Sequence, residues 1–460
     1  MTQYKFLKEE LKELNSKIEL DLYYDINIFS SKESRIVVDQ DGISSSNDKD
    51  KGVKIRVWDG EKYLEYGQSS LEINSIETQL NRLLKEANEN SKLINKVIEL
   101  KYETEILNKN YVKISQKQDI KETSKVLNEI KNRIRKFDNE VVSARCALIE
   151  EEEEHIFSNK YRSLYQKIPL KILVVIAYVK CKDEITRMVY ESYVANDFSV
   201  FKKFESEEKE FNQKIINTKK VKRLKGGKYH ALLSPKLTGL LAHESFGHGM
   251  EADTMMKGRA LASIWSGKKI GSDAINIIDY PAIEGKHGEF YFDHDGNLAK
   301  KTYLVKKGVV NEPMADLYSK SKLNLKSSSN ARAESFDHKL YARMSNTYFD
   351  TGDKTKDELL SEIKEGIYII ESNGGMEDPK GWGVQIQGCF GQKIKDGKLV
   401  DEFYDGFTLT GFLPDIIKNI SGISKEFEIE GGGSCGKGHK EWVRVSEGGP
   451  YLLIEELILG

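Results

Sequence analysis

The sequence predicts an α+β protein built from two domains. The chain has 460 residues, enough for two to four domains of about 100–200 residues each. In the first half, segments with apolar residues at helical spacing alternate with segments rich in β-branched and aromatic residues. The second half has one clear helical segment, followed by many short strand signals between glycines. We therefore expect an N-terminal α+β domain over 1–225 and a C-terminal β-rich domain over 226–460.

Helices and strands alternate in the first half. Apolar residues spaced by three and four predict helices around residues 4–18, 73–87 and 127–137. Strand signals with Asp-Gly hairpin turns cover residues 21–40, 52–60 and 62–67. Two more strands are expected over 140–150 and 168–178, separated by a solvated turn at the acidic run 150–154. The domain is thus predicted to be a mixed sheet with helices on one face.

The second half begins after a basic segment, 214–228, which ends in two glycines and is predicted to connect the domains. A helix is expected from Leu237 to about Lys257. Short strand signals follow, including a hairpin through Asp295 and Gly296. The C-terminal domain is therefore expected to be mostly antiparallel β and to carry this helix.

Composition excludes several classes of protein. The chain has 71 basic and 73 acidic residues and a net charge of -2, so it lacks the positive charge with which proteins neutralise nucleic-acid phosphates. Its longest apolar run, 168–179, is too short for a transmembrane helix of about 20 residues. The first residues have no apolar stretch typical of a signal peptide. We expect a cytoplasmic protein with neither a nucleic-acid nor a membrane partner.

Most cysteines and histidines have structural interpretations. Four cysteines are too few for a disulfide-stapled scaffold, and three of them lie in apolar contexts that predict core positions: Cys146, Cys181 and Cys389. Four histidines lack the spacing of metal ligands and are expected to be structural or exposed: His155, His230, His287 and His338.

A metal-binding pattern begins at His243. His243, Glu244 and His248 form H-E-x-x-x-H, one residue longer than the H-E-x-x-H motif that places two zinc ligands on one helix face. In a regular helix a separation of five residues leaves the two rings about 140° apart. We expect a π-type bulge or a break to bring the histidines together, with Gly247 and Gly249 lowering the cost of the distortion.

The residues alone do not determine which side chain is the third metal ligand. Two histidines and a carboxylate on a buried helix need partners, because burying them unpaired costs several kcal/mol, and a metal would satisfy them. Zinc needs a third protein ligand and one open position. Glu251 and Asp253 are near in sequence, while Cys435 is remote but lies in a glycine-rich segment.

At this point the sequence resembles the TldD/PmbA family of zinc metallopeptidases, once described as modulators of DNA gyrase. The matching segments occur in a consistent order in both halves: GVKIRV at 52–57, HESFGHGMEAD at 243–253, FDHDG at 292–296, ARAES at 331–335, RMSNTY at 343–348 and CGKGH at 435–439. The H-E-x-x-x-H pattern with a distant C-x-K is a specific combination.

The resemblance implies one zinc ion (Zn2+) per subunit, held by His243, His248 and Cys435. Glu244 would be the catalytic general base that activates a zinc-bound water. The substrates would be small or unfolded peptides bound as extended strands. The subunit would work as a homodimer, or as a heterodimer with a related subunit that lacks the metal motif. Because this chain has the motif, it resembles the active TldD branch.

Two segments depart from the family pattern. Asp-His-Asp-Gly at 293–296 replaces Asp-Asp-Glu-Gly, and the segment after Cys435 is one residue shorter than C-x-K-x-G-Q. The cysteine remains, so the metal site should survive, while a role of the following loop in substrate contact is open. Three residues are candidates for substrate binding: Arg343 and Asn346 through the peptide backbone, and His294 from a cleft-facing hairpin.

Other readings of the same residues are weaker. GGGSCGK at 431–437 fits part of a P-loop, but Gly438 replaces the required Ser or Thr and a strand is expected to follow. Cys435 and His439 could form the nucleophile and base of a thiol enzyme, which leaves the histidine cluster without a role. The main alternative to a zinc peptidase is a non-catalytic peptide-binding partner subunit, which has no need of Glu244.

Overall fold

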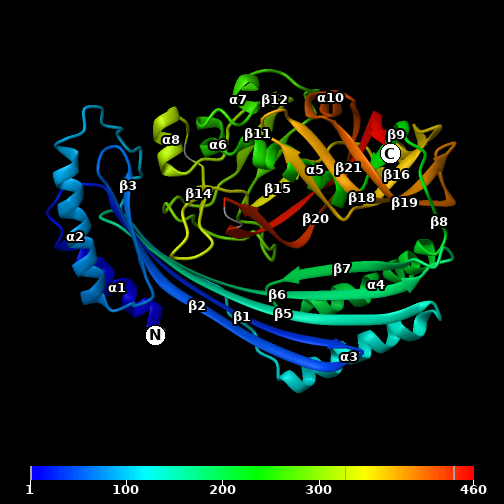
Figure 1. Ribbon diagram of the computed structural model, residues 1–460, viewed down its shortest axis with the longest axis horizontal. Helices are drawn as coiled ribbons and strands as arrows, with labels where there is room; N and C mark the ends of the chain where they lie inside the picture. The colour runs from blue at the N-terminus through cyan, green and yellow to red at the C-terminus, as the bar shows by residue number, and fades with distance from the viewer. Residues whose placement is uncertain (1–2, 327, 439–440) are drawn as a thin grey trace.

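The computed structural model describes residues 3–326, 328–438 and 441–460, with Glu430 described by its backbone alone. It contains a long curved sheet from the first half of the chain and a second, larger sheet from the second half (Figure 1). The two-domain α+β class is as predicted. The division at 225/226 remains a prediction, since the short strand β8 (Val221–Lys222) already pairs with the second sheet.

The first sheet has the order β3-β2-β1-β5-β6-β4, with β7 also paired to β6. Its strands are β1 Tyr24–Asp39, β2 Gly42–Trp58, β3 Tyr63–Gln68, β4 Leu107–Val112, β5 Val141–Ser158, β6 Arg162–Lys180 and β7 Thr186–Ala195. The pairing of β4 with β6 is parallel and the others are antiparallel. The sheet is therefore mixed, as predicted.

Helices cover one face of this sheet: α1 Gln3–Ser16, α2 Ile73–Ser91, α3 Ile120–Phe137 and α4 Ser199–Thr218. Two apolar clusters form beneath them, α1 and α2 at one end of the strands and α3 and α4 at the other. The opposite face packs against the C-terminal half through Phe290 and Phe292. Helices on one face were predicted, but α4 was not: its apolar stripe is interrupted by charges, and its last turns fall where a linker was expected.

The acidic run 150–154 is not a turn, as expected, but the middle of β5. Its charges are neutralised by residues far away in sequence. Lys167 Nζ lies 2.8 Å from Glu152 Oε2, and Arg444 Nη1 lies 3.3 Å from Glu151 Oε2. Because strands place neighbours on opposite faces, the run pairs with cations on both sides of the sheet.

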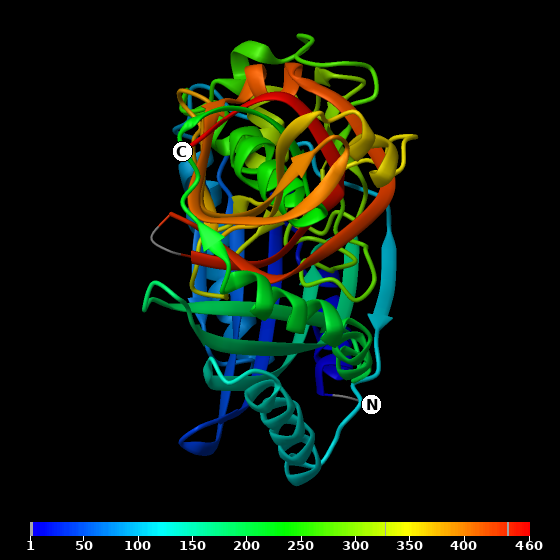
Figure 2. The ribbon, with the colours of Figure 1, turned by 90° about the vertical axis from the view of Figure 1, so that its right-hand side faces the viewer.

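The second sheet has the order β12-β11-β10-β15-β21-β9-β16-β18-β19-β8, with β17 on β18 and β20 on β21. Its further strands are β9 Gly227–Leu233, β10 Ile277–Asp279, β11 Thr302–Lys306, β12 Val309–Val310, β15 Asn346–Phe349, β16 Glu365–Glu371, β17 Gly374–Asp378, β18 Gly383–Lys395, β19 Lys398–Phe412, β20 Ile420–Lys437 and β21 Glu441–Leu459. Most pairs are antiparallel, as expected. Figure 2 shows these strands curled around a central helix, α5 (Pro235–Ala242).

Shorter elements complete the C-terminal half: α6 Ala252–Met256, α7 Ala262–Trp265, α8 Leu317–Leu323, α9 Lys356–Ser361, α10 Leu413–Lys418 and the β13–β14 pair at Ala331–Arg332 and Tyr341–Ala342. The expected hairpin through Asp295 and Gly296 was wrong: a single bridge, Phe292 to Leu298, spans this turn. Instead Asp293 organises the loop, because its carboxylate accepts the amides of Asp295 and Asn297.

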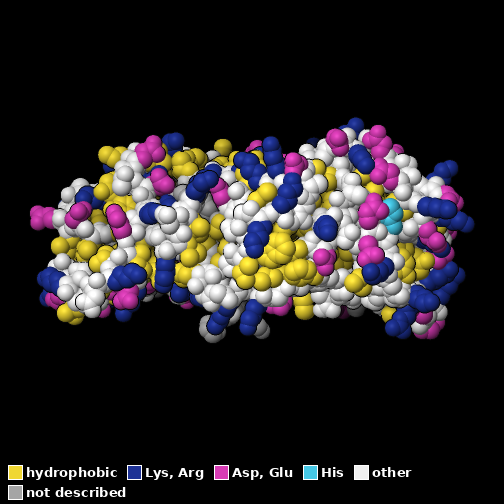
Figure 3. All heavy atoms as spheres, turned by 90° about the horizontal axis from the view of Figure 1, so that it is seen from above, with side chains coloured by type: hydrophobic (Ala, Val, Ile, Leu, Met, Phe, Trp, Pro, Cys, Tyr) yellow, Lys and Arg dark blue, Asp and Glu magenta, His cyan; other side chains and the backbone are white. Residues whose placement is uncertain are grey.

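The surface carries mixed charge. Seen from above in Figure 3, lysine and arginine side chains alternate with acidic and apolar ones instead of forming one basic surface. This distribution agrees with the net charge of -2. Among the residues that the structure describes, no helix is long and apolar enough to cross a membrane.

Candidate metal centre

The helix that carries the two histidines is distorted between them. It begins at α5, where the Ser234 hydroxyl accepts the amide of Leu237, and widens into a π-helical turn over His243–Gly247. A 3-10 turn, His248–Met250, and α6 follow. The indole of Trp382 donates to the carbonyl of Ser245 at 3.2 Å, which holds the widened turn. The predicted π-type distortion is therefore confirmed, and it divides the single helix expected to reach Lys257.

The two glycines of the motif permit close packing. Their expected role was to make the distortion easier, yet the φ of Gly247, -61°, suits any residue. A Cβ atom at Gly247 would lie 1.9 Å from Met344 Sδ, and one at Gly249 would lie 2.9 Å from Trp382 Nε1. The helix thus lies against these two side chains at a distance that only glycine allows.

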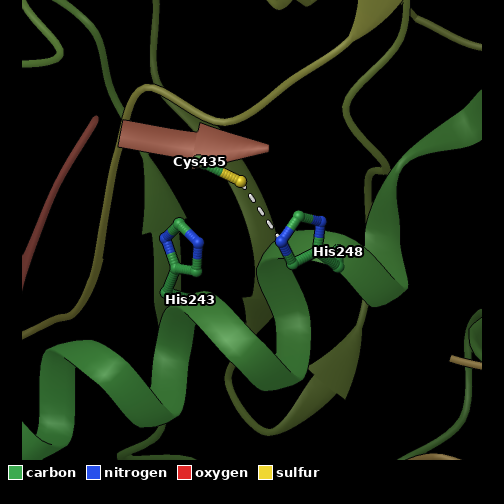
Figure 4. A group of neighbouring side chains, drawn as sticks. All are labelled: His243, His248 and Cys435. Atoms are coloured by element: carbon green, nitrogen blue, oxygen red, sulfur yellow. Dashed lines mark hydrogen bonds between the residues drawn. The ribbon is translucent and has the colours of Figure 1, made fainter. Parts of the chain in front are cut away.

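Cys435 from β20 completes a cluster with the two histidines. Its Sγ lies 3.2 Å from His248 Nε2, and one donor atom from each of His243, His248 and Cys435 lies within 4.8 Å of the other two. Figure 4 shows the three side chains pointing toward one another from the helix and the strand. The imidazole planes are nearly perpendicular, at 87°.

Long-range pairing places the cysteine. In the β20–β21 hairpin Cys435 is opposite Val443. Arg343, which is buried, donates to the carbonyl of Cys435 at 2.5 Å and to that of Glu441 at 3.1 Å. One guanidinium therefore holds both strands of the hairpin over the helix.

The three side chains also shift one another's protonation. Burial acts to raise the pKa of the Cys435 thiol, but the neighbouring imidazoles of His243 and His248 lower it to about 4. Burial acts to lower the pKa of His243, and the Cys435 sulfur raises it to about 9. The cluster thus favours a thiolate, the form of cysteine that binds metals.

A carboxylate stands behind each imidazole. His248 Nδ1 lies 3.6 Å from Glu251 Oε2, and His243 Nδ1 lies 3.6 Å from Glu447 Oε2. Carboxylates at the far nitrogen of a metal-binding histidine fix its ring and raise its basicity. Glu447 was missed by the sequence analysis, since nothing in its local sequence marks it.

The surroundings of the two carboxylates differ. Glu251 is buried beside Lys437 Nζ at 2.8 Å and Arg343 Nε at 3.7 Å, and these cations, together with His248, outweigh burial and lower its pKa to about 2. Burial raises the pKa of Glu447 to about 7. Glu251 and Asp253, the alternative third ligands, thus face Lys437, which also donates to Asp253 Oδ1 at 2.7 Å.

Glu244 lies on the widened turn between the two histidines. Strand β17 passes closely over it, because a Cβ atom at Gly375 would lie 2.6 Å from Glu244 Cγ. Glu377 on the same strand is a second carboxylate near the cluster. Its pKa is raised to about 9 by burial, and by the nearby charges of Glu251 and Glu244.

The three residues expected to bind substrate all make hydrogen bonds within the protein, and Arg343 and Asn346 are buried; their role in substrate binding stays a prediction. Arg343 holds the hairpin, as described above. Asn346 donates to the carbonyls of Tyr280 and Pro281. His294 accepts the amide of Ala333 and contacts Phe29 edge-on. It is partly exposed and lines a cavity at the junction with the first sheet. His439, the base of the alternative thiol mechanism, lies outside the described residues. The P-loop reading fails because residues 431–437 lie within β20 and no helix follows.

Comparison with known proteins places this chain in a family. A family model described as the PmbA/TldA metallopeptidase C-terminal domain matches residues 226–460, just over half of the chain. The chain belongs to the TldD/PmbA family. The resemblance stated from the sequence is therefore confirmed.

Relatives in this family carry metalloprotease names. A "metalloprotease" of Methanothermobacter thermautotrophicus is 30% identical over 70% of this chain and 70% of its own length. A "zinc metalloprotease TldD homolog" of Saccharolobus solfataricus is 31% identical over 54% of this chain and 55% of its own. With the second relative the match thus spans about half of each protein.

Solved structures share the whole fold. A protein titled a modulator of DNA gyrase, from Thermotoga maritima, superposes with a TM-score of 0.77 at 18% identity, and 100% of both chains is covered. TldE from Thermococcus kodakarensis superposes with a TM-score of 0.70 at 15% identity, again over 100% of both chains. At these identities the likeness concerns the fold of the family.

Proposed function

We propose that this chain is a zinc-dependent peptidase that hydrolyses small or unfolded peptides. The observation that carries the proposal is the convergence of His243, His248 and Cys435, with donor atoms within 4.8 Å of one another, while Glu244 follows His243 on the same widened turn. Two imidazoles and a thiolate are ligands that zinc prefers, and three protein ligands leave a position open for catalysis. The carboxylates behind both imidazoles also suit a metal centre.

The chemistry follows from these positions. Zinc held by the three residues supplies Lewis-acid polarisation of a peptide carbonyl and lowers the pKa of water. Glu244 takes a proton from the attacking water and returns it to the nitrogen of the leaving amine. Glu251 and Glu447 act through the imidazoles and keep each ring in place. Cys435 enters as a thiolate because its pKa is near 4.

Metal analysis together with one substitution tests this proposal. We expect one zinc ion per subunit in the purified protein, and loss of zinc in His243→Ala or His248→Ala. Glu244→Gln should keep the zinc and lose about 10²–10⁴-fold of the peptide cleavage, because an amide cannot accept the proton. Cleavage within a few-fold of the parent would show that Glu244 is not the base.

We also propose a dimer, either of two copies or with a related subunit that lacks the metal motif. The TldE structure supports the second form in fold only. An intact Glu244 argues against the alternative in which this chain is a non-catalytic peptide-binding subunit. Light scattering on the purified chain should give twice the subunit mass if two copies pair, and the single subunit mass if the partner is the related subunit. A monomer that cleaves peptides fully would contradict the dimer alone.

A further inference from the structure

A cavity of about 790 Å³ lies beside the metal centre and has no role in the chemistry above. The elements that carry the site contribute to its wall: Leu240 from α5, Gly374 from β17, Gly433 from β20 and Glu447 from β21. Leu240 lies less than one helical turn before His243, and Glu447 lies 3.6 Å from its Nδ1. One part of the cavity wall, formed by Leu240 and Glu447, therefore adjoins His243.

The opposite wall comes from β7, at the edge of the first sheet. Met188 and Tyr190 line the cavity, with 54% and 43% of their surfaces exposed. Because side chains alternate along a strand, both share a face with Val194, which packs against Phe290 of the C-terminal half. Two large apolar side chains thus lie uncovered on the side of β7 that faces the metal-bearing half.

The charged side chains of this cavity already have partners. The wall has six of them: Arg187, Glu191, Lys236, Glu371, Asp405 and Glu447. Lys236 donates to Glu191 at 2.5 Å, and Arg187 donates to Asp405 at 2.7 Å. Glu371 accepts from Lys214 at 3.0 Å, and Glu447 faces His243. A charged ligand side chain would have to compete with one of these pairs.

We propose that the cavity binds an aromatic side chain of the peptide substrate, close to the bond that is cleaved. The inference rests on the peptidase function proposed above. An aromatic ring would cover Met188 and Tyr190 and gain from contact with a thioether and a second ring. The cavity lies within the roughly 300–1,000 Å³ typical of ligand pockets. It therefore has room for this side chain and the adjoining peptide backbone.

Peptide binding to an inactive, zinc-loaded variant tests whether the cavity prefers an aromatic side chain, independently of catalysis. A set of fluorescein-labelled alanine-rich peptides would carry Phe, Ala, Asp or Lys at each position in turn, and binding to Glu244→Gln would be followed by anisotropy. At one position Phe should bind about tenfold or more tightly than Ala, and Asp and Lys no better than Ala. Met188→Asp combined with Tyr190→Ser should abolish this preference at unchanged zinc content.

A matched control lies on the neighbouring turn. Ile185 is equally exposed, at 54%, and does not line the cavity, so Ile185→Asp should keep the preference for Phe. No preference at any position, no binding of any peptide, or a preference that survives the double substitution would each overturn the inference. Peptide cleavage by the wild-type protein is measured in a separate experiment. A protein that binds the Phe peptides through Met188 and Tyr190 but cleaves none would refute the peptidase and not the cavity.

Discussion

Two buried clusters of charge can be compared, one where the first sheet meets the C-terminal half and one at the metal centre. In the first, Arg56 donates to Asp25 at 2.6 Å and to Asp295 of the C-terminal half at 2.6 Å. Tyr23 and Asn27 also donate to Asp25, each at 2.9 Å. The guanidinium and the two carboxylates of this cluster are thus paired with one another, although Tyr63 Oη and His155 Nδ1 nearby are buried without a hydrogen-bond partner.

At the metal centre some buried polar atoms lack a hydrogen-bond partner. His243 Nδ1, Glu251 Oε1 and Glu377 Oε2 are buried and have no hydrogen-bond partner. An unpaired buried polar group costs about 1–3 kcal/mol, so such groups persist where function requires them. The charges of the Arg56 cluster are therefore neutralised by one another, while at the metal centre charged groups beside the proposed reaction site retain unsatisfied atoms.

Arg56→Met should have the largest effect on stability. It leaves Asp25 and Asp295 buried without their cation, which should lower the free energy of unfolding by about 3–5 kcal/mol, measured by urea denaturation. Zinc per folded subunit should not change. The control is Arg82→Met in an exposed pair with Glu86, which should change stability by no more than about 0.5 kcal/mol. Equal effects of both substitutions would contradict the structural role of the junction.

Gly247→Ala tests the packing of the widened turn at the metal centre. The added methyl would meet Met344 Sδ, so overpacking should lower the free energy of unfolding by about 1–3 kcal/mol. It should also reduce zinc content, since the widened turn must move. The control is Gly383→Ala, where an added Cβ has no neighbour within 4 Å. A fully loaded Gly247→Ala protein of parental stability would disprove the close packing.

The two carboxylates behind the imidazoles should respond differently. Glu447→Gln should lower zinc affinity about 10–100-fold with little change in the free energy of unfolding. Glu251→Gln should lower both, because it leaves Lys437 and Arg343 without a buried anion. Chelator competition and urea denaturation measure the two effects. Glu456→Gln, in an exposed pair with Lys228, is the control, and equal zinc affinity in all three variants would remove the proposed positioning role.

Local patterns made part of this structure predictable. Helices α1, α2 and α3 and strands β1, β3 and β6 follow from apolar spacing and turn signals, and the π-helical turn follows from the spacing of His243 and His248, because these are properties of neighbouring residues. The convergence of Cys435 with them could be anticipated only through the family resemblance. The β20–β21 hairpin that places it depends on Arg343, almost a hundred positions away in the sequence.

Features that depend on distant partners were not predictable. The acidic run 150–154 suggested a turn because its cations, among them Lys167 and Arg444, lie elsewhere in the sequence. The hydrogen bonds of Arg343, Asn346 and His294 to distant backbone groups could not be foreseen, because a motif does not say which way a side chain points. Glu447 was missed because its position beside His243 arises only when β21 packs on the helix.

Zinc content after substitution of single cysteines tests the metal centre most directly. Cys435→Ser should lose zinc on dialysis against a chelator, because a neutral hydroxyl is a poor replacement for a thiolate. Cys389→Ser should keep one zinc ion per subunit, because Cys389 is buried away from the cluster and burial raises its pKa to about 12. Retention of zinc by Cys435→Ser, with parental affinity, would contradict the account.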